Sequence, residues 1–178
     1  MIANLLTGLR LLLVIPVAWS CADPTRFANT TLLLMIVVAI ASDYWDGKVA
    51  RKLNTASATG QLFDHSTDFL FVSAGLFGAA YTGQISPWLP ILIVLAFSQY
   101  VIDSYFLYRQ KQLRMSFLGR WNGVFYFLPL LLIALTRLEP LASIQPILHS
   151  LLLVIVFALT LSTLASMLDR ALAPLRTR

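Results

Sequence analysis

Residues 29–52 read NTTLLLMIVVAIASDYWDGKVARK, an apolar run that ends in two aspartates and a group of basic residues. About 20 apolar residues cross the hydrocarbon core of a bilayer as a helix, so this stretch predicts a transmembrane helix with acids near one end. The whole chain is similarly apolar: 58% of its 178 residues are hydrophobic, 12% are charged, and the mean hydropathy is +0.79. Soluble domains carry about 25% charged residues. The composition therefore excludes a soluble enzyme, a disordered chain and a nucleic-acid-binding domain.

Outward from this stretch, breaks rich in Pro, Gly and polar residues divide the chain into six apolar segments. The first contains Arg10 in its middle and places Trp19 just before Cys21, which is unlike a cleaved signal peptide. We therefore expect an all-α integral membrane protein with one domain over residues 1–178. The six transmembrane helices are predicted at 2–20, 29–52, 57–82, 88–109, 121–138 and 144–168.

The basic residues indicate an orientation. If the N-terminus is cytoplasmic, ten Lys and Arg residues fall on the cytoplasmic side and two, Arg26 and Arg137, on the other. Cytoplasmic loops of membrane proteins carry such an excess, so both termini are predicted in the cytoplasm. The formal net charge of +5 then reflects orientation and contact with membrane lipids, with no nucleic-acid partner.

Four of the eight acids fall within residues 43–68. Asp43 and Asp46 share one face of the second predicted helix, and Asp64 and Asp68 share one face of the third. A turn between these helices lets both faces meet near the cytoplasmic surface. Because ionised groups in a membrane are unfavourable, such residues indicate a functional site.

Converging carboxylates repel one another unless they are neutralised. Mg²⁺ or Mn²⁺ prefers carboxylate oxygens and completes its shell with substrate phosphates, and a pair of ions can hold both oxygens of a phosphoryl substitution. Two such ions are therefore predicted here. Small residues on the same helix faces, Gly47, Ala50 and Gly60, leave room for a nucleotide.

Other interpretations of these residues exist. Aspartates in membrane helices also serve transporters as cation or proton sites, and Gly and Ala at helical spacing also support close helix packing. A transporter usually shows an internal repeat or broken helices, whereas these acids cluster in one hairpin. An intramembrane prenyltransferase is a third alternative, but such enzymes place two acidic motifs on well-separated helices of a longer chain.

The pattern Asp43-x2-Asp46-Gly47-x2-Ala50-Arg51-x8-Gly60-x3-Asp64-x3-Asp68 resembles the signature of the CDP-alcohol phosphotransferase family at every fixed position. Six helices with cytoplasmic termini also agree with that family. Near the N-terminus, Asn4-x-Leu6-Thr7-x2-Arg10 is similar to a segment common in bacterial members. The resemblance implies a phospholipid synthase in the bacterial inner membrane, with its active site facing the cytoplasm.

The resemblance also implies roles for these residues. A CDP-linked donor, CDP-diacylglycerol in most bacterial members, binds with its diphosphate on the metal ions. Asp43, Asp46 and Asp64 are the implied main metal ligands, and Asp68 is a further ligand or the base that deprotonates the acceptor alcohol. CMP then leaves. The implied nucleotide-binding residues are Gly47, Ala50, Arg51 and Gly60.

The acceptor stays open. Many phosphatidylglycerophosphate synthases have Asp-Pro-x2-Asp-Lys where this chain has Asp64-His65-Ser66-Thr67-Asp68-Phe69, which weakens the case for glycerol-3-phosphate. Asp-His followed by a small residue resembles aminoalcohol phosphotransferases, which use a CDP-aminoalcohol and a lipid alcohol. Bidentate arginines suit a phosphorylated acceptor, and the candidate acceptor-binding residues are Arg109, Arg114, Arg120 and Asp103.

Two smaller predictions concern packing. His65 lies one residue off the acid face, where we expect packing or a hydrogen bond to the site rather than metal ligation. Ala74-x3-Gly78 and Gly119-x3-Gly123 can support close helix contacts, including a homodimer.

Overall fold

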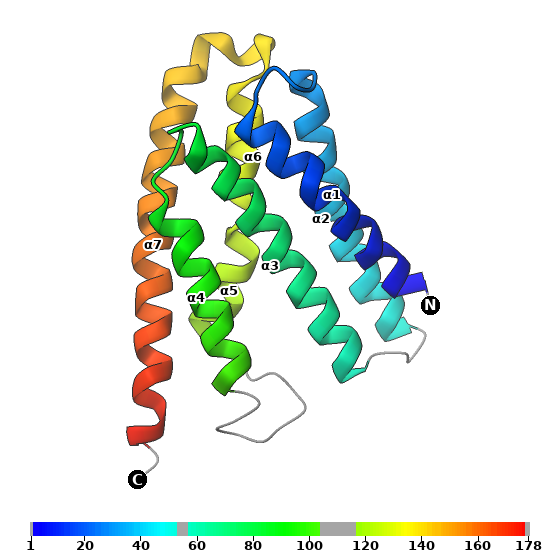
Figure 1. Cartoon of the computed structure of the whole chain (residues 1–178), viewed down its shortest axis with the longest axis vertical. Helices are drawn as coiled ribbons and strands as arrows, with labels where there is room; N and C mark the ends of the chain where they lie inside the picture. Colours follow the sequence, from blue (N-terminus) through cyan, green and yellow to red (C-terminus); the bar gives the residue numbers. More distant parts are fainter. Residues whose placement is uncertain (1, 53–56, 104–116, 177–178) are drawn as a thin grey trace.

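The structure, a computed structural model, describes residues 2–52, 57–103 and 117–176, and no strand is found in these ranges. It forms a helical bundle (Figure 1). The helices are α1 (Ile2–Ala22), α2 (Asn29–Lys52), α3 (Ala58–Tyr81), α4 (Trp88–Ile102), α5 (Phe117–Phe125), α6 (Phe127–Thr136), the 3₁₀ helix η2 (Glu139–Ile144) and α7 (Gln145–Arg176).

Three stretches of the described chain are long and apolar enough to cross a membrane: Leu5–Ala22, Phe117–Thr136 and Glu139–Leu172. The shorter helix α4 is also apolar. Helices α2 and α3 have 24 residues each and carry the four clustered acids. The prediction of an all-helical membrane protein is therefore confirmed, whereas the number of six membrane spans stays a prediction.

The start of α1 and the end of α7 lie at the same end of the bundle (Figure 1). The end of α2 and the start of α3 lie at this end too, near the start of α1. The connections from α1 to α2 and from α6 to α7 lie at the opposite end. Successive long helices thus run in alternating directions along the bundle.

Two predicted helices differ from the structure. The fifth helix, predicted as one piece at 121–138, begins at Phe117 and is divided at Tyr126 into α5 and α6. Pro129 has no N–H to donate to the carbonyl of Phe125, which explains the division at this point. The last helix, predicted at 144–168, continues to Arg176, and residues 104–109 of the fourth predicted helix lie outside the described residues.

Helix α1 packs mainly against α3 and α2, while α7 packs against α4, α5 and α6. Helices α1 and α3 approach each other closely at Gly78, where an added Cβ would meet the backbone carbonyl of Ala18 and lie 2.9 Å from the Cβ of Cys21. The Ala74-x3-Gly78 pair thus lies on a helix that packs closely within the chain. The core around this contact includes Val17, Leu32, Ile36, Phe71, Leu76, Leu130 and Ile133.

Candidate active site

The four acids meet between α2 and α3. Carboxylate oxygens of Asp43, Asp46 and Asp64 lie within 4.8 Å of one another, and those of Asp64 and Asp68 lie within the same distance of each other and of a ring nitrogen of His65. The predicted convergence of the two acid faces is therefore present. Asp46 is the most buried of the acids, with 4% of its side chain exposed, and Asp43 is the most open, with 43% exposed.

The start of α3 sets the position of its acids. Ser57 is the N-cap, and its hydroxyl accepts a hydrogen bond from the backbone N–H of Gly60 at 3.0 Å. Such caps satisfy a free N–H of the first helical turn. From this turn, Asp64 and Asp68 follow one helical turn apart and point to one side of the helix.

Arg10 lies at the centre of the acids. Its guanidinium reaches all four: one terminal nitrogen lies 2.9 Å from Asp46 Oδ2, and the other lies 3.2 Å from Asp64 Oδ1, 3.4 Å from Asp43 Oδ1 and in contact with Asp68. The arginine side chain is fully buried. A planar guanidinium with five N–H donors suits such a multiple contact.

Neighbours on α1 and α2 hold this arrangement. The Arg10 Nε donates to the Ser42 hydroxyl at 3.4 Å, and the Thr7 hydroxyl donates to Asp46 Oδ2 at 3.1 Å. Thr7 and Arg10 come from α1, 33 or more positions away from the acids they contact. Both were part of the family-like N-terminal segment, but neither was predicted as a site residue. The one available signal was a charged residue in the middle of an apolar helix.

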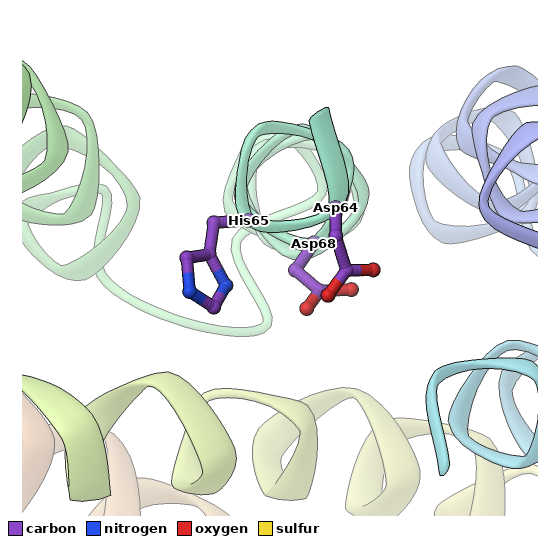
Figure 2. A group of neighbouring side chains, drawn as sticks. All are labelled: Asp64, His65 and Asp68. Atoms are coloured by element: carbon purple, nitrogen blue, oxygen red, sulfur yellow. The ribbon is translucent and has the colours of Figure 1, made fainter. Parts of the chain in front are cut away.

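His65 lies beside the acid pair on α3 (Figure 2). Its ring extends to one side of the helix, while Asp64 and Asp68 point together to the other. The His65 Nε2 lies 3.4 Å from the Gln61 amide nitrogen, one turn earlier on α3. The hydrogen-bond partner of His65 is thus Gln61, and its ring nitrogen also lies within 4.8 Å of carboxylate oxygens of Asp64 and Asp68. That His65 does not bind a metal stays a prediction.

A cavity of about 540 Å³ adjoins the acids. Its charged and polar lining includes Asp43, Asp64, His65, Asp68, Arg120 and Arg170. The remaining walls are mostly apolar and come from all helices between α2 and α7. The apolar lining residues include Ile40, Phe69, Val72, Ile93, Phe97, Val124, Phe125, Phe127, Leu128, Leu131 and Met167. The cavity thus combines carboxylates, two cations and an apolar surface.

Of the other predicted site residues, the structure places some at the cavity and others away from it or outside the described residues. Arg120 lines the cavity, whereas Asp103 follows α4 and is absent from the described lining. Arg109 and Arg114 lie outside the described residues. Gly47, Ala50 and Arg51 fall in the last turns of α2, and what surrounds these three residues lies outside the described part of the structure. Gly60 lies in the first turn of α3.

Arg170 is a cavity residue that the sequence did not single out. It extends from α7, and its guanidinium carbon lies 4.7 Å from the ring centroid of Tyr100 on α4. Cations favour this position over an aromatic ring. Arg170 was interpreted from the sequence only as part of the cytoplasmic excess of basic residues, because nothing in its spacing linked it to the acids.

The donor set suits a hard divalent cation. Four carboxylates within reach of one another are the ligands that Mg²⁺ and Mn²⁺ prefer, and both ions commonly complete their shells with phosphate oxygens. Asp43, Asp46, Asp64 and Asp68 are the residues that would hold such ions. The open side of the site at Asp43 leaves access for a phosphate.

Comparisons with known proteins agree with this chemistry. A family model described as CDP-alcohol phosphatidyltransferase matches residues 1–169. A curated relative, the cardiolipin synthase (CMP-forming) of Streptomyces coelicolor, is 29% identical over 106 residues, which are 57% of this chain and 49% of the relative. The chain therefore matches about half the length of this relative. No solved structure matches the chain.

Proposed function

The chain belongs to the CDP-alcohol phosphatidyltransferase family, and from this premise we propose that it transfers the phosphatidyl group of CDP-diacylglycerol to an acceptor alcohol and releases CMP. The observation that carries the proposal is the meeting of four carboxylates from α2 and α3 at one end of a largely apolar cavity. A lipid with a nucleoside diphosphate head needs both an acid-rich site for metal ions and an apolar surface. The similarity to a CMP-forming relative supports the same leaving group.

In the proposed reaction, Asp43, Asp46 and Asp64 hold Mg²⁺ or Mn²⁺, and two ions are expected. When bound, these ions neutralise the charge of the diphosphate and of the leaving group. Gly47, Ala50, Arg51 and Gly60 form the expected nucleotide pocket at the facing ends of α2 and α3.

Asp68 has the exposure that a base or an additional ligand needs, with 23% of its side chain accessible. As the base, it takes the proton of the acceptor hydroxyl. The acceptor oxygen then forms a bond to the β-phosphorus, the bond between that phosphorus and the bridging oxygen breaks, and CMP leaves with the electron pair. The fixed site contributes mainly by positioning and charge stabilisation.

The acceptor is proposed to carry a phosphate. Arg120 and Arg170 line the cavity that contains Asp64 and Asp68, and arginine binds phosphate through paired hydrogen bonds. Glycerol-3-phosphate and phosphatidylglycerol both offer a free hydroxyl and a phosphate. The apolar walls favour the lipid, because a small dianion gains nothing from apolar surface and loses its hydration.

The name of the relative also supports a lipid acceptor. Cardiolipin consists of two phosphatidyl groups joined through one glycerol, so a synthase that forms it together with CMP uses a lipid acceptor. We therefore propose phosphatidylglycerol as the preferred acceptor. The site is proposed to face the cytoplasm of a bacterial inner membrane, at the end of the bundle that contains both chain ends.

The test is an acceptor panel. Purified protein in lipid nanodiscs receives CDP-diacylglycerol, Mg²⁺ and one of phosphatidylglycerol, glycerol-3-phosphate, inositol phosphate or diacylglycerol. CMP release and the mass of the lipid product are measured. The proposal expects CMP with phosphatidylglycerol and a product with four acyl chains. CMP with glycerol-3-phosphate instead would overturn the lipid acceptor, and no CMP with any alcohol would overturn the transferase.

A further inference from the structure

Arg10 is the cation at the centre of the proposed metal site. It is fully buried and lies within 4.0 Å of Asp43, Asp46, Asp64 and Asp68. With all four acids ionised, the five side chains together have a formal charge of minus three. Because an arginine stays protonated in proteins, this positive charge persists when other cations arrive.

The origin of Arg10 distinguishes it from the acids. It comes from α1, whereas the acids come from α2 and α3, and its Nε also donates to the Ser42 hydroxyl. One guanidinium therefore ties three helices together at the site. A cation in this place cannot be a metal ligand, so it acts on bound ions through charge and through the positions of the carboxylates.

We propose that Arg10 is the counter-ion of the acid cluster, which weakens the binding of divalent cations on their own and strengthens the binding of the donor's diphosphate once the ions are present. Two divalent cations would change the formal charge of the five side chains from minus three to plus one. Without Arg10 the same loaded site would be neutral. Arg10 thus makes the metal-loaded site attract an anion.

This inference rests on the proposed function, because it assumes a metal-dependent site for a nucleoside diphosphate. Arg10 is a positioning residue in this account, not a catalytic one. Its removal is expected to shift two affinities in opposite directions. A merely structural role would weaken both affinities together, because loss of the site's shape harms both ligands.

The experiment uses the full chain in detergent or nanodiscs. Free Mn²⁺ is followed by electron paramagnetic resonance to obtain the Kd for Mn²⁺ alone, and calorimetry at saturating Mn²⁺ gives the Kd for CDP. For Arg10→Gln, Mn²⁺ alone should bind at least about tenfold more tightly and CDP about tenfold more weakly, since charges a few ångströms apart interact strongly in a buried site. Arg10→Lys retains the charge and should keep both values within about threefold of the wild type.

Arg137→Gln is the matched control. Arg137 is another arginine between helices and is partly buried. It donates to the backbone carbonyl of Ser20 at 2.7 Å, at the other end of α1 from the acids. Its loss should lower the melting temperature and leave both affinities unchanged. This variant separates a general loss of stability from the effect of charge at the acid cluster.

If Arg10→Gln is unstable without metal, the proposal expects Mn²⁺ to raise its melting temperature more than that of the wild type, because the ions supply the missing positive charge. A variant that stays unfolded at saturating Mn²⁺ would contradict the proposal, as would two affinities that fall together or do not move. Absence of Mn²⁺ binding by the wild type would instead overturn the metal site of the proposed function, and this inference with it.

Discussion

At the residue scale, Arg10 of α1 joins the four acids of α2 and α3 into one cluster. Spacings of three and four residues place Asp43 with Asp46 and Asp64 with Asp68 on single helix faces, and the structure brings these faces together. Arg10 lies more than 30 positions from the nearest acid it contacts. Helical periodicity orders residues within one helix, but it does not fix how α1 is rotated against α2 and α3. The contact therefore became visible only in the packed bundle.

Arg120 offers a direct test of the phosphate-binding part of the cavity. Arg120→Ala should raise the KM for a phosphorylated acceptor about tenfold or more with a smaller change in kcat, because charged hydrogen bonds contribute about 1.5–3 kcal/mol. Initial rates at varied acceptor concentration measure this. The control is Arg26→Ala, which removes an exposed arginine stacked 4.2 Å from the Trp19 ring, in the connection from α1 to α2. An unchanged KM in Arg120→Ala would remove Arg120 from the site.

At the element scale, the lengths of the apolar segments predicted the existence of the helices better than the residues at which the helices begin and end. The division at Tyr126 depends on Pro129, which the apolar pattern alone did not weigh. Across this division, the Tyr126 hydroxyl lies 2.8 Å from the Thr163 hydroxyl, and Ser162 donates to the Asn122 side chain at 2.7 Å. These bonds join α5 and its junction with α6 to α7. The pairing of elements through such bonds depends on tertiary packing that no local pattern encodes.

Gly78 tests the packing of α1 on α3, which brings Arg10 to the acids. Gly78→Ala should destabilise the protein by about 1–3 kcal/mol, since the added methyl group meets a backbone carbonyl that cannot move freely. Thermal unfolding in nanodiscs measures the loss. Gly8→Ala is the matched control, because an added Cβ there meets nothing within 4 Å. Equal melting temperatures for the two variants would refute the close packing at Gly78.

At the scale of the whole molecule, composition and the distribution of basic residues predicted a helical membrane protein, and the bundle places the start of α1 and the end of α7 together (Figure 1). The side of the membrane that this end faces follows only from the excess of Lys and Arg. The homodimer also stays a prediction. Gly78 packs within the chain, and an added Cβ at Gly123 meets nothing within 4 Å, so neither supplies evidence for a second copy.

Cysteine labelling tests the orientation. The one native cysteine, Cys21, is buried, and Cys21→Ala provides a background for single introduced cysteines at exposed sites. In sealed right-side-out vesicles, an impermeant maleimide should label Arg26→Cys and leave Ser57→Cys unlabelled until the membrane is opened. The reverse pattern would contradict cytoplasmic termini.

The central claim is that the acids around Arg10 form a metal-dependent phosphatidyl-transfer site. The most direct measurement is CMP release from CDP-diacylglycerol by the wild type and by Asp43→Asn, Asp46→Asn, Asp64→Asn and Asp68→Asn, with Mg²⁺, with EDTA, and with EDTA followed by excess Mn²⁺. Asp23→Asn is the control, because Asp23 lies in the connection from α1 to α2, at the opposite end of the bundle from the acid cluster. There the hydroxyl and backbone N–H of Thr25 donate hydrogen bonds to the Asp23 carboxylate, which lowers its pKa.

CMP release by the wild type should stop in EDTA and return with Mn²⁺. Each clustered variant should lose about a hundredfold or more in kcat/KM, while Asp23→Asn keeps its activity. Release that persists in EDTA, or clustered variants as active as the wild type, would contradict a metal-dependent transfer site at these acids.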